Sequence, residues 1–295
     1  MKKRRVFLPL FLFLLLFTIP SSCKYYAYGL EEFFYRENTL DKRIDTLTEL
    51  ADTQIPQNLP DEYNILVITD IHFGGENREK NGAHNERAFL KLISEIPEAE
   101  KPEFCICLGD VAEHGLDSEF RDFANDIVKP LEDMGIKTYN VIGNHDLYNS
   151  GWASYQKHLN PGTSFYHFKT QNFSWYFLDS ASCSLGNSQL TKLRRKMESD
   201  DAPKLVFMHV PLYADGLFYF TMQNSAERNQ IISVFNKNNV KAVIDGHTHI
   251  QSVSNLGNFN EYTMAGYLEK RAYTCLINTS PSPRDRTRSR MPSSA

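Results

Sequence analysis

Side chains that bind divalent metal ions recur in five short motifs along the middle of the chain. Each motif follows a short apolar run and contains an aspartate, an asparagine or a histidine. The motifs are Asp70-Ile71-His72, Gly109-Asp110, Gly143-Asn144-His145-Asp146, His209 and Gly246-His247-Thr248-His249. Carboxylate, amide and imidazole donors without thiolate suit Mn, Fe or Zn. Two such ions about 3.5–4 Å apart need a bridging carboxylate and an open edge for water and phosphate.

The apolar runs before the motifs are predicted β-strands that alternate with helices. The predicted strands cover residues 65–69, 104–108, 138–142, 204–209 and 241–245. The predicted helices cover residues 84–96, 117–134, 188–198 and 225–238, and a hairpin joins residues 164–168 to residues 173–179. This alternation indicates a layered α/β fold with buried strands. Because ligands in such folds bind beyond the carboxyl ends of the strands, we expect the motifs to meet at one edge.

Each motif has an ordinary structural explanation when it is taken alone. A Gly-Asp pair after a strand is usually a turn, and a single histidine such as His209 is more often a buried structural residue. The ordered set of five is far less easily explained in this way. It therefore indicates a metal site rather than five separate turns.

The order DxH, GD, GNHD, H and GHxH resembles the signature of the calcineurin-like metallophosphoesterases. The resemblance extends from about Asn64 to His249. It implies a β-sandwich of two mixed sheets flanked by helices. It also implies hydrolysis of a phosphate ester with two divalent ions, Mn, Fe or Zn.

The resemblance also implies a role for each motif residue. One metal ion would be held by Asp70, His72 and His249, and the other by Asn144, His209 and His247. Asp110 would bridge the two ions. His145 would not be a ligand; it would protonate the leaving-group oxygen or stabilise the transition state.

Two residues after Asp110 depart from the protein-phosphatase version of the family. Glu113 stands where that version has an aspartate, and we expect it to pair with His145 and orient it. His114 replaces an arginine and cannot supply a bidentate clamp on phosphate. Purple acid phosphatases have a tyrosine ligand at the position of Glu113 and a glycine at that of His72. We therefore favour a phosphodiester or nucleotide-like small molecule as substrate, with monoesters left open.

The charge of the chain argues against a nucleic acid polymer as partner. The chain has 295 residues, which suits one large α/β domain. Residues 24–274 contain 35 acidic and 24 basic residues. Such an acidic domain offers no basic surface for a polynucleotide backbone.

The N-terminus is predicted to be a lipoprotein-type signal peptide, residues 1–23. A basic start, residues 2–5, precedes an apolar run over residues 6–19, then Ser21-Ser22 and the lipidation candidate Cys23. We expect an extracytoplasmic protein anchored by lipid to a bacterial membrane. The alternatives are an uncleaved N-terminal anchor or a secreted protein.

The remaining boundaries follow from composition. Residues 24–60 are predicted to be a helical prelude or spacer, and residues 61–274 the metallophosphoesterase domain, cut short at its C-terminal end. Residues 275–295 are rich in Ser, Pro and Arg and resemble the translation of a sequencing adapter, so we expect a disordered, non-native tail. Cys105, Cys107 and Cys183 have no regular spacing and predict no disulfide framework.

A second class of function fits the same anchor and ligands. The chain would then be a non-catalytic surface lipoprotein that binds metal for structure or for a partner. The presence of His145 argues against this alternative, because a purely structural metal site has no use for that residue.

Overall fold

The computed structural model describes residues 39–76, 86–267 and 274–278. The predicted signal peptide, Cys23 and residues 24–38 lie outside these ranges, as do residues 279–295. Among the described residues, no helix has the length and apolar character needed to cross a membrane.

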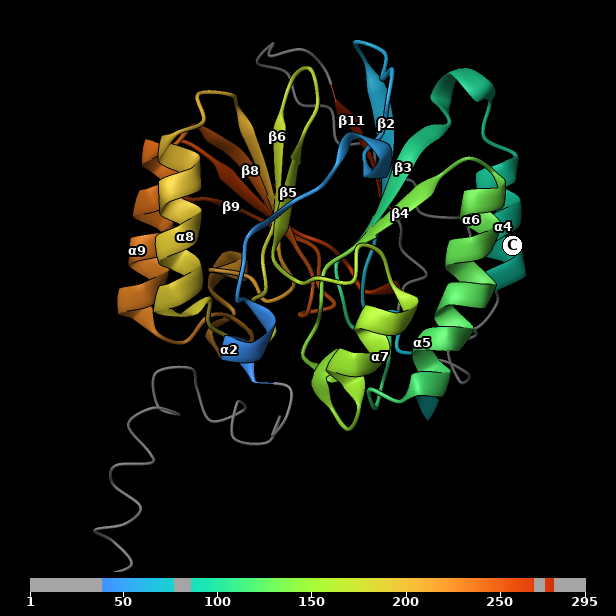
Figure 1. Cartoon of the computed structure of the whole chain (residues 1–295), viewed down its shortest axis with the longest axis horizontal. Coiled ribbons are helices and arrows are strands. Elements are labelled where there is room, and N and C mark those ends of the chain that lie inside the picture. The colour runs from blue at the N-terminus through green and yellow to red at the C-terminus, as the bar shows by residue number, and fades with distance from the viewer. Residues whose placement is uncertain (1–38, 77–85, 268–273, 279–295) are drawn as a thin grey trace, which may run out of the picture.

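The described strands form two mixed sheets (Figure 1). The four-stranded sheet has the order β11-β2-β3-β4, with β2 (Tyr63–Ile68), β3 (Pro102–Cys107) and β4 (Lys137–Asn140) parallel and β11 (Thr274–Asn278) antiparallel to β2. The seven-stranded sheet has the order β1-β5-β6-β7-β8-β10-β9. Its strands are β1 (Thr48–Glu49), β5 (Tyr166–Lys169), β6 (Ser174–Phe177), β7 (Lys204–Phe207), β8 (Val240–Asp245), β9 (Ser252–Asn255) and β10 (Asn260–Thr263).

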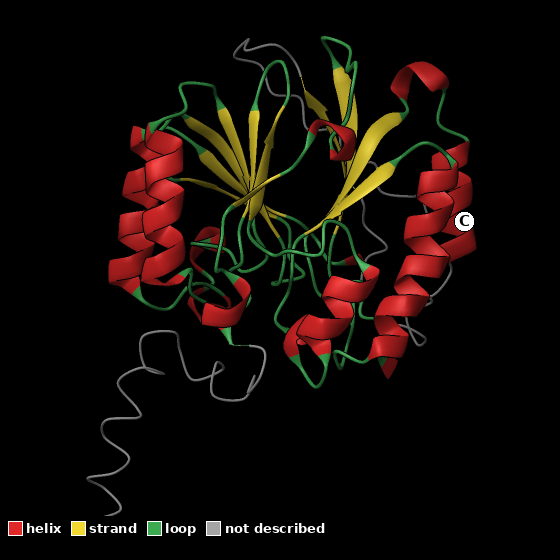
Figure 2. Cartoon of the chain, in the orientation of Figure 1, coloured by secondary structure: helices red, strands yellow, loops and turns green. Residues whose placement is uncertain are grey.

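Helices cover the outer face of each sheet (Figure 2). On one side lie α4 (Glu86–Ser94), α5 (Asp117–Phe123) and α6 (Lys129–Asp133), and on the other α8 (Gly186–Glu198) and α9 (Ser225–Lys237). The short helices α2 (Leu40–Arg43) and α7 (Gly151–His158) lie below the sheets in the view of Figure 1. Successive side chains of β2 point to opposite faces and so belong to two hydrophobic cores. Leu66 and Ile68 face the helices, while Ile65 and Val67 face the other sheet. The predicted α/β sandwich is confirmed.

Aromatic side chains fill the space between the two sheets. Trp175 stacks on Phe207 with ring centroids 5.7 Å apart, and Phe177 stacks on Phe207 at 5.1 Å. From the other sheet, Phe104 meets Trp175 edge-on at 5.2 Å. Offset and edge-to-face contacts of this kind add to the free energy of burial. They hold the two sheets, and therefore their carboxyl edges, in a fixed relation.

The predicted helix over residues 117–134 forms, but it contains an irregular turn. A π-helical turn, Ala124–Val128, joins α5 to α6, which has Pro130 in its first turn. Proline has no N–H, and its ring clashes with the carbonyl of the residue four positions earlier in a regular α-helix, so the wider π-turn before Pro130 accommodates it.

Residues 39–60 pack on the domain, as a prelude would, but they do not form the predicted helix. Within them only α2 is α-helical, and Leu40 and Ile44 are buried in the outer core against α8 and α9. Strand β1 extends the larger sheet by pairing in parallel with β5. The spacing of apolar residues predicted a longer helix, but pairing with an open strand edge determined the structure instead.

The C-terminal boundary also differs from the prediction. The disordered tail was expected from Cys275, whereas residues 274–278 form β11 and pair with β2 from Tyr63 to Val67. This pairing covers an edge of the four-stranded sheet that would otherwise be open.

Candidate active site

The metal-binding motifs meet where the carboxyl ends of β2, β3, β4, β7 and β8 come together. Three overlapping groups of side chains have their ligand atoms within 4.8 Å of one another. The groups are Asp70, His72 and His249; His72, Asp110 and His145; and Asp110, His209 and His247. The predicted ligand Asn144 joins the third group, because its Oδ1 lies 3.1 Å from Nε2 of His209.

The backbone at this edge adopts an uncommon conformation. Asp70, His72, Asp110, His247 and His249 all have φ between +50° and +68°. Left-handed backbone in residues with a Cβ costs of order 1–3 kcal/mol each and persists only where the surroundings enforce it. Such strain clusters at functional sites, and here it turns each side chain off its strand end toward the common centre.

Glycines in the motifs allow the loops to approach closely. A Cβ on Gly143 would lie 2.1 Å from Oδ1 of Asp110, inside its van der Waals radius. Gly109, with φ +103°, lies against the Gly143 backbone in the same way. The glycine before Asp110 and the glycine before Asn144 are therefore required for the two loops to share one site.

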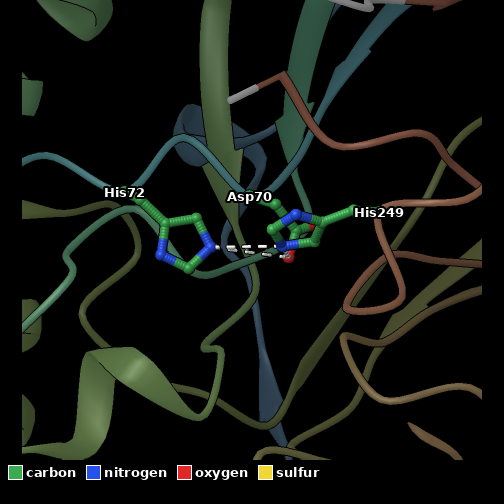
Figure 3. A group of neighbouring side chains, drawn as sticks. All are labelled: Asp70, His72 and His249. Atoms are coloured by element: carbon green, nitrogen blue, oxygen red, sulfur yellow. Dashed lines mark hydrogen bonds and ion pairs between the residues drawn. The ribbon is translucent and has the colours of Figure 1, made fainter. Parts of the chain in front are cut away.

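Asp70 forms the first group with His72 and His249 (Figure 3). Its Oδ2 accepts hydrogen bonds from Oγ1 of Thr69 at 2.7 Å and from the backbone N–H of His247 at 3.1 Å. Its Oδ1 is buried without a hydrogen bond of normal geometry and faces Nε2 of His249 at 3.3 Å. The Nε2 atoms of His72 and His249 are 3.3 Å apart. Three donors thus converge on one point.

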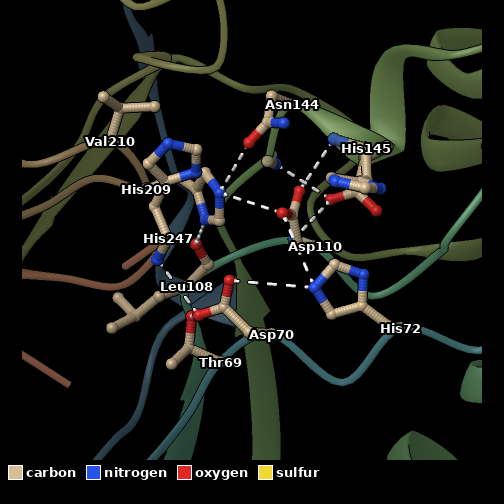
Figure 4. Close-up of polar contacts among 12 residues, drawn as sticks. Thr69, Asp70, His72, Leu108, Asp110, Asn144, His145, His209, Val210 and His247 are labelled. Atoms are coloured by element: carbon tan, nitrogen blue, oxygen red, sulfur yellow. Dashed lines mark hydrogen bonds and ion pairs between the residues drawn. The ribbon is translucent and has the colours of Figure 1, made fainter. Parts of the chain in front are cut away.

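Asp110 lies between the first and third groups (Figure 4). Its Oδ2 is 3.8 Å from Nε2 of His72 and 3.2 Å from Nε2 of His209. Its Oδ1 accepts a hydrogen bond from the backbone N–H of His145 at 2.8 Å. The carboxylate is therefore held in place and faces ligands on both sides, as a bridging ligand must.

The ring of His209 is oriented by its backbone neighbours. Its Nδ1–H donates to the carbonyl of Leu108 at 2.9 Å, so Nε2 points at Asp110 and Asn144. Oγ of Ser180 accepts hydrogen bonds from the backbone N–H groups of His209 and Val210. Bonds of this kind fix the tautomer and direction of a metal-binding histidine.

The carboxylates and imidazoles of the site shift one another's pKa values. Burial raises the pKa of Asp70, but the close approach of His249 and the charge of His209 outweigh it and bring the pKa to about 2. The pKa of Asp110 falls further for the same kind of reason. Burial opposes protonation of His209, yet Asp110 raises its pKa to about 9. Burial and the charge of His209 lower the pKa of His247 to about 4.

These shifts identify a site that attracts positive charge. Metal binding requires neutral imidazoles, so a metal ion would compete with a proton at His209. The donor set, the buried Oδ1 of Asp70 and the convergence of rings all fit a divalent metal ion.

Glu113 has a different side-chain partner from the one predicted. Its Oε2 lies 2.7 Å from Nδ1 of His72 and 3.9 Å from Nδ1 of His145. His145 is held instead by the backbone, since its Nδ1–H donates to the carbonyl of Glu113 at 2.9 Å. The extra methylene of glutamate carries the carboxylate past His145 to the neighbouring ring.

Asp146 is a buried residue of the site to which the sequence assigned no role. Its carboxylate accepts backbone hydrogen bonds from Asp110 at 3.0 Å, Ala112 at 2.9 Å and Gly143 at 2.9 Å. Burial and the nearby charge of Asp110 raise its pKa to about 6. Its hydrogen bonds connect the loop of Asp110 to the loop of Asn144. In the sequence, only its position at the end of the GNHD motif indicated such a role.

The fold and the site together define a metal-dependent phosphoesterase, a hydrolase of phosphoric esters. The chain belongs to the calcineurin-like phosphoesterase family, whose sequence model matches residues 63–251. The resemblance inferred from the five motifs is therefore confirmed.

Comparisons with individual proteins agree with this assignment. The chain is 25% identical over 189 residues to a probable cyclic nucleotide phosphodiesterase from Fibrobacter succinogenes, a match that covers 62% of this chain and 71% of that protein. Its fold is similar to that of a dimetal phosphatase from Danio rerio, with a TM-score of 0.56, 17% identity, and coverage of 76% of this chain and 98% of the other. A purple acid phosphatase from yellow lupin gives a TM-score of 0.55 at 10% identity, covering 75% of this chain and 50% of the other.

Proposed function

We propose that the chain uses two divalent metal ions, Mn, Fe or Zn, to hydrolyse a phosphodiester or a nucleotide-like small phosphate ester. The central observation is the placement of Asp110 between His72 and His209. One ion would be held by Asp70, His72 and His249 and the other by Asn144, His209 and His247, with Asp110 shared. Ions in such a site polarise the phosphoryl group and activate water.

His145 is the candidate proton donor to the leaving oxygen. Its backbone N–H binds Asp110, and its Nδ1–H binds the carbonyl of Glu113. The ring is thereby fixed, and the proton that the imidazolium can release is the one on Nε2. The side chain keeps 30% of its surface exposed, so a substrate can reach it. General acid catalysis of this kind contributes typically 10²–10⁴-fold.

The preference for a diester is supported by two observations. The relative from Fibrobacter succinogenes is described as a probable cyclic nucleotide phosphodiesterase. His114, at the position of the phosphatase arginine, is bound to Glu119 through Nδ1 at 2.9 Å and supplies no guanidinium.

The test is hydrolysis of bis-p-nitrophenyl phosphate and of p-nitrophenyl phosphate, with Mn and with chelator. We expect metal-dependent turnover with a higher rate on the diester. Asp110→Asn should lose both metal binding and turnover, whereas His145→Ala should keep metal binding and lose turnover about 10²–10⁴-fold. Bound metal without turnover on either ester would instead support the non-catalytic alternative.

The proposed location is the outer side of a bacterial membrane, with a lipid on Cys23. The basic start, the apolar run and the small residues before Cys23 support it. Radiolabelled fatty acid should enter the wild-type chain and not Cys23→Ser. Equal labelling of the two would refute the lipid anchor on Cys23.

A further inference from the structure

Two exposed aromatic rings contact the histidines of the site from different loops. The ring of Tyr148 is packed edge-on against His145, with centroids 5.4 Å apart and an interplanar angle of 76°. The ring of Phe220 meets His247 at 6.2 Å and 63°. Tyr148 is 37% exposed and Phe220 53% exposed. Each ring thus contacts a histidine of the site while part of its side chain is open to solvent.

The two rings lie next to histidines on opposite sides of Asp110. His145, beside Tyr148, packs against His72 with centroids 4.7 Å apart. His247, beside Phe220, packs against His209 at 5.1 Å. A phosphate ester bound over Asp110 would therefore have one aromatic side chain toward each of its two ends.

The backbone under Tyr148 is held firmly. Its N–H donates to the carbonyl of His145, and its carbonyl accepts from the N–H of Gly151 at 2.8 Å. The backbone of Gly115 is so close that a Cβ there would lie 2.2 Å from the carbonyl oxygen of Tyr148. The ring consequently projects from a fixed point beside His145.

The loop that carries Phe220 is anchored by a buried carboxylate. Glu261, fully buried on β10, accepts hydrogen bonds from the backbone N–H groups of Leu212 at 2.6 Å, Tyr213 at 3.0 Å and Ala214 at 2.8 Å. The loop closes where the N–H of Met222 donates to the carbonyl of Pro211 at 3.0 Å. A charged acceptor with several backbone donors makes strong hydrogen bonds. The loop is therefore pinned at its base.

We propose that Tyr148 and Phe220 each stack on a planar aromatic group of the substrate, a nucleobase or an aryl group, Tyr148 at the end beside His145 and Phe220 at the end beside His247. This inference rests on the proposed phosphoesterase function and assigns its specificity to two residues. Stacking between a base and an aromatic side chain tolerates any planar ring, because every such ring has a π-face. Stacking on substrate also explains why two solvent-exposed rings on anchored loops lie beside two histidines of the site.

The experiment compares two diesters that share the p-nitrophenyl leaving group and differ only in the second substituent, phenyl or cyclohexyl. The ratio of their kcat/KM values is measured for the wild-type protein, Phe220→Leu, Phe220→Tyr, Tyr148→Leu and Tyr148→Phe. Differences in intrinsic reactivity cancel when the ratios of variant and wild type are compared. Tyr219→Leu is the matched control, because Tyr219 lies in the same loop and is 89% exposed.

We expect Phe220→Leu to lower the phenyl-to-cyclohexyl ratio about tenfold, mainly through a higher KM for the phenyl ester. Tyr148 lies beside His145, at the leaving-group end, so Tyr148→Leu should raise the KM of both esters, which share the p-nitrophenyl group, and leave their ratio unchanged. The aromatic replacements and Tyr219→Leu should keep the wild-type KM values and ratio. An additional ester, thymidine 5′-p-nitrophenyl phosphate, distinguishes the sources: greater sensitivity to Phe220→Leu than the phenyl ester indicates a nucleobase, and lesser sensitivity an aryl group.

A failure of the aromatic assignment can be distinguished from a failure of the proposed phosphoesterase function. Turnover of all esters, with a ratio that Phe220→Leu does not change and KM values that Tyr148→Leu does not change, would overturn the aromatic assignment and leave the phosphoesterase function intact. Absence of metal-dependent turnover on every ester would overturn both. A loss in kcat alone, equal for phenyl and cyclohexyl esters, would show that the rings support the site and do not contact substrate.

Discussion

The carboxylate of Glu113 lies 2.7 Å from Nδ1 of His72, and this contact directs Nε2 of the same ring at Asp70, Asp110 and His249. Burial opposes protonation of His72, but the close contact with the Glu113 carboxylate and the charge of Asp110 raise its pKa to about 9. Such a partner fixes the ring and makes the ligand more basic. Glu113 therefore acts on the metal site through His72.

Replacement of Glu113 should weaken metal binding before it affects chemistry. Loss of an outer partner of a metal-binding histidine typically lowers metal affinity 10–100-fold. We expect a loss of this size in Glu113→Ala and a smaller one in Glu113→Gln, measured by titration against a chelating dye. At saturating metal, kcat should recover most of its wild-type value. Unchanged affinity with a lower kcat would instead place the function of Glu113 at His145.

Removal of the Asp146 carboxylate should destabilise the loops that carry Asp110 and Asn144. Asp146→Ala leaves three buried backbone N–H groups without an acceptor. An unsatisfied buried group costs about 1–3 kcal/mol, so we expect a loss of about 3 kcal/mol or more in the free energy of unfolding. Asp146→Asn keeps one acceptor oxygen and should lose less. Urea unfolding measures both; a loss below about 1 kcal/mol in the alanine variant would contradict the proposed role.

The buried ion pair between Arg43 and Asp179 should be necessary for stability. Nε and a terminal nitrogen of Arg43 contact the two carboxylate oxygens at 2.7 and 2.9 Å. Breaking a buried pair by removing one partner costs about 3–5 kcal/mol. We expect Arg43→Met to lose that much in urea unfolding, and the double variant Arg43→Met with Asp179→Leu to lose less. The exposed Lys91–Glu95 pair offers a control, and Lys91→Met should change stability by under about 1 kcal/mol.

His167 should make the protein less stable in mild acid. Burial and the charge of Lys196 lower its pKa from 6.5 to about 4. Below pH 6.5 the unfolded chain binds a proton that the folded chain excludes, so the free energy of unfolding falls as pH decreases toward 4. At about 1.4 kcal/mol per pKa unit, the loss approaches about 3 kcal/mol. His167→Gln should have a shallower dependence in urea unfolding between pH 7 and pH 4.5, and an unchanged slope would contradict this assignment.

The local signals for the fold were strong in the sequence. Strands such as β2 and β3 are short apolar runs, and their alternate residues serve the two cores. Helices α8 and α9 begin and end within two residues of the predicted ranges. The segment from Leu40 to Leu50 was harder, because its apolar spacing fits a helix while its partner strand, β5, lies more than a hundred residues further along.

The sequence by itself determined which atoms the site contains, since aspartate, asparagine and histidine at strand ends identify metal chemistry whatever their exact contacts. Only the tertiary structure decided which of these atoms face one another. Asp70 binds the backbone of His247 across 177 positions of the chain, and the length of one side chain directs Glu113 to His72 in place of His145. The placement of Phe220 beside His247 depends on a buried glutamate from another strand. Sequence patterns record burial within one element, whereas such contacts depend on how separate elements pack.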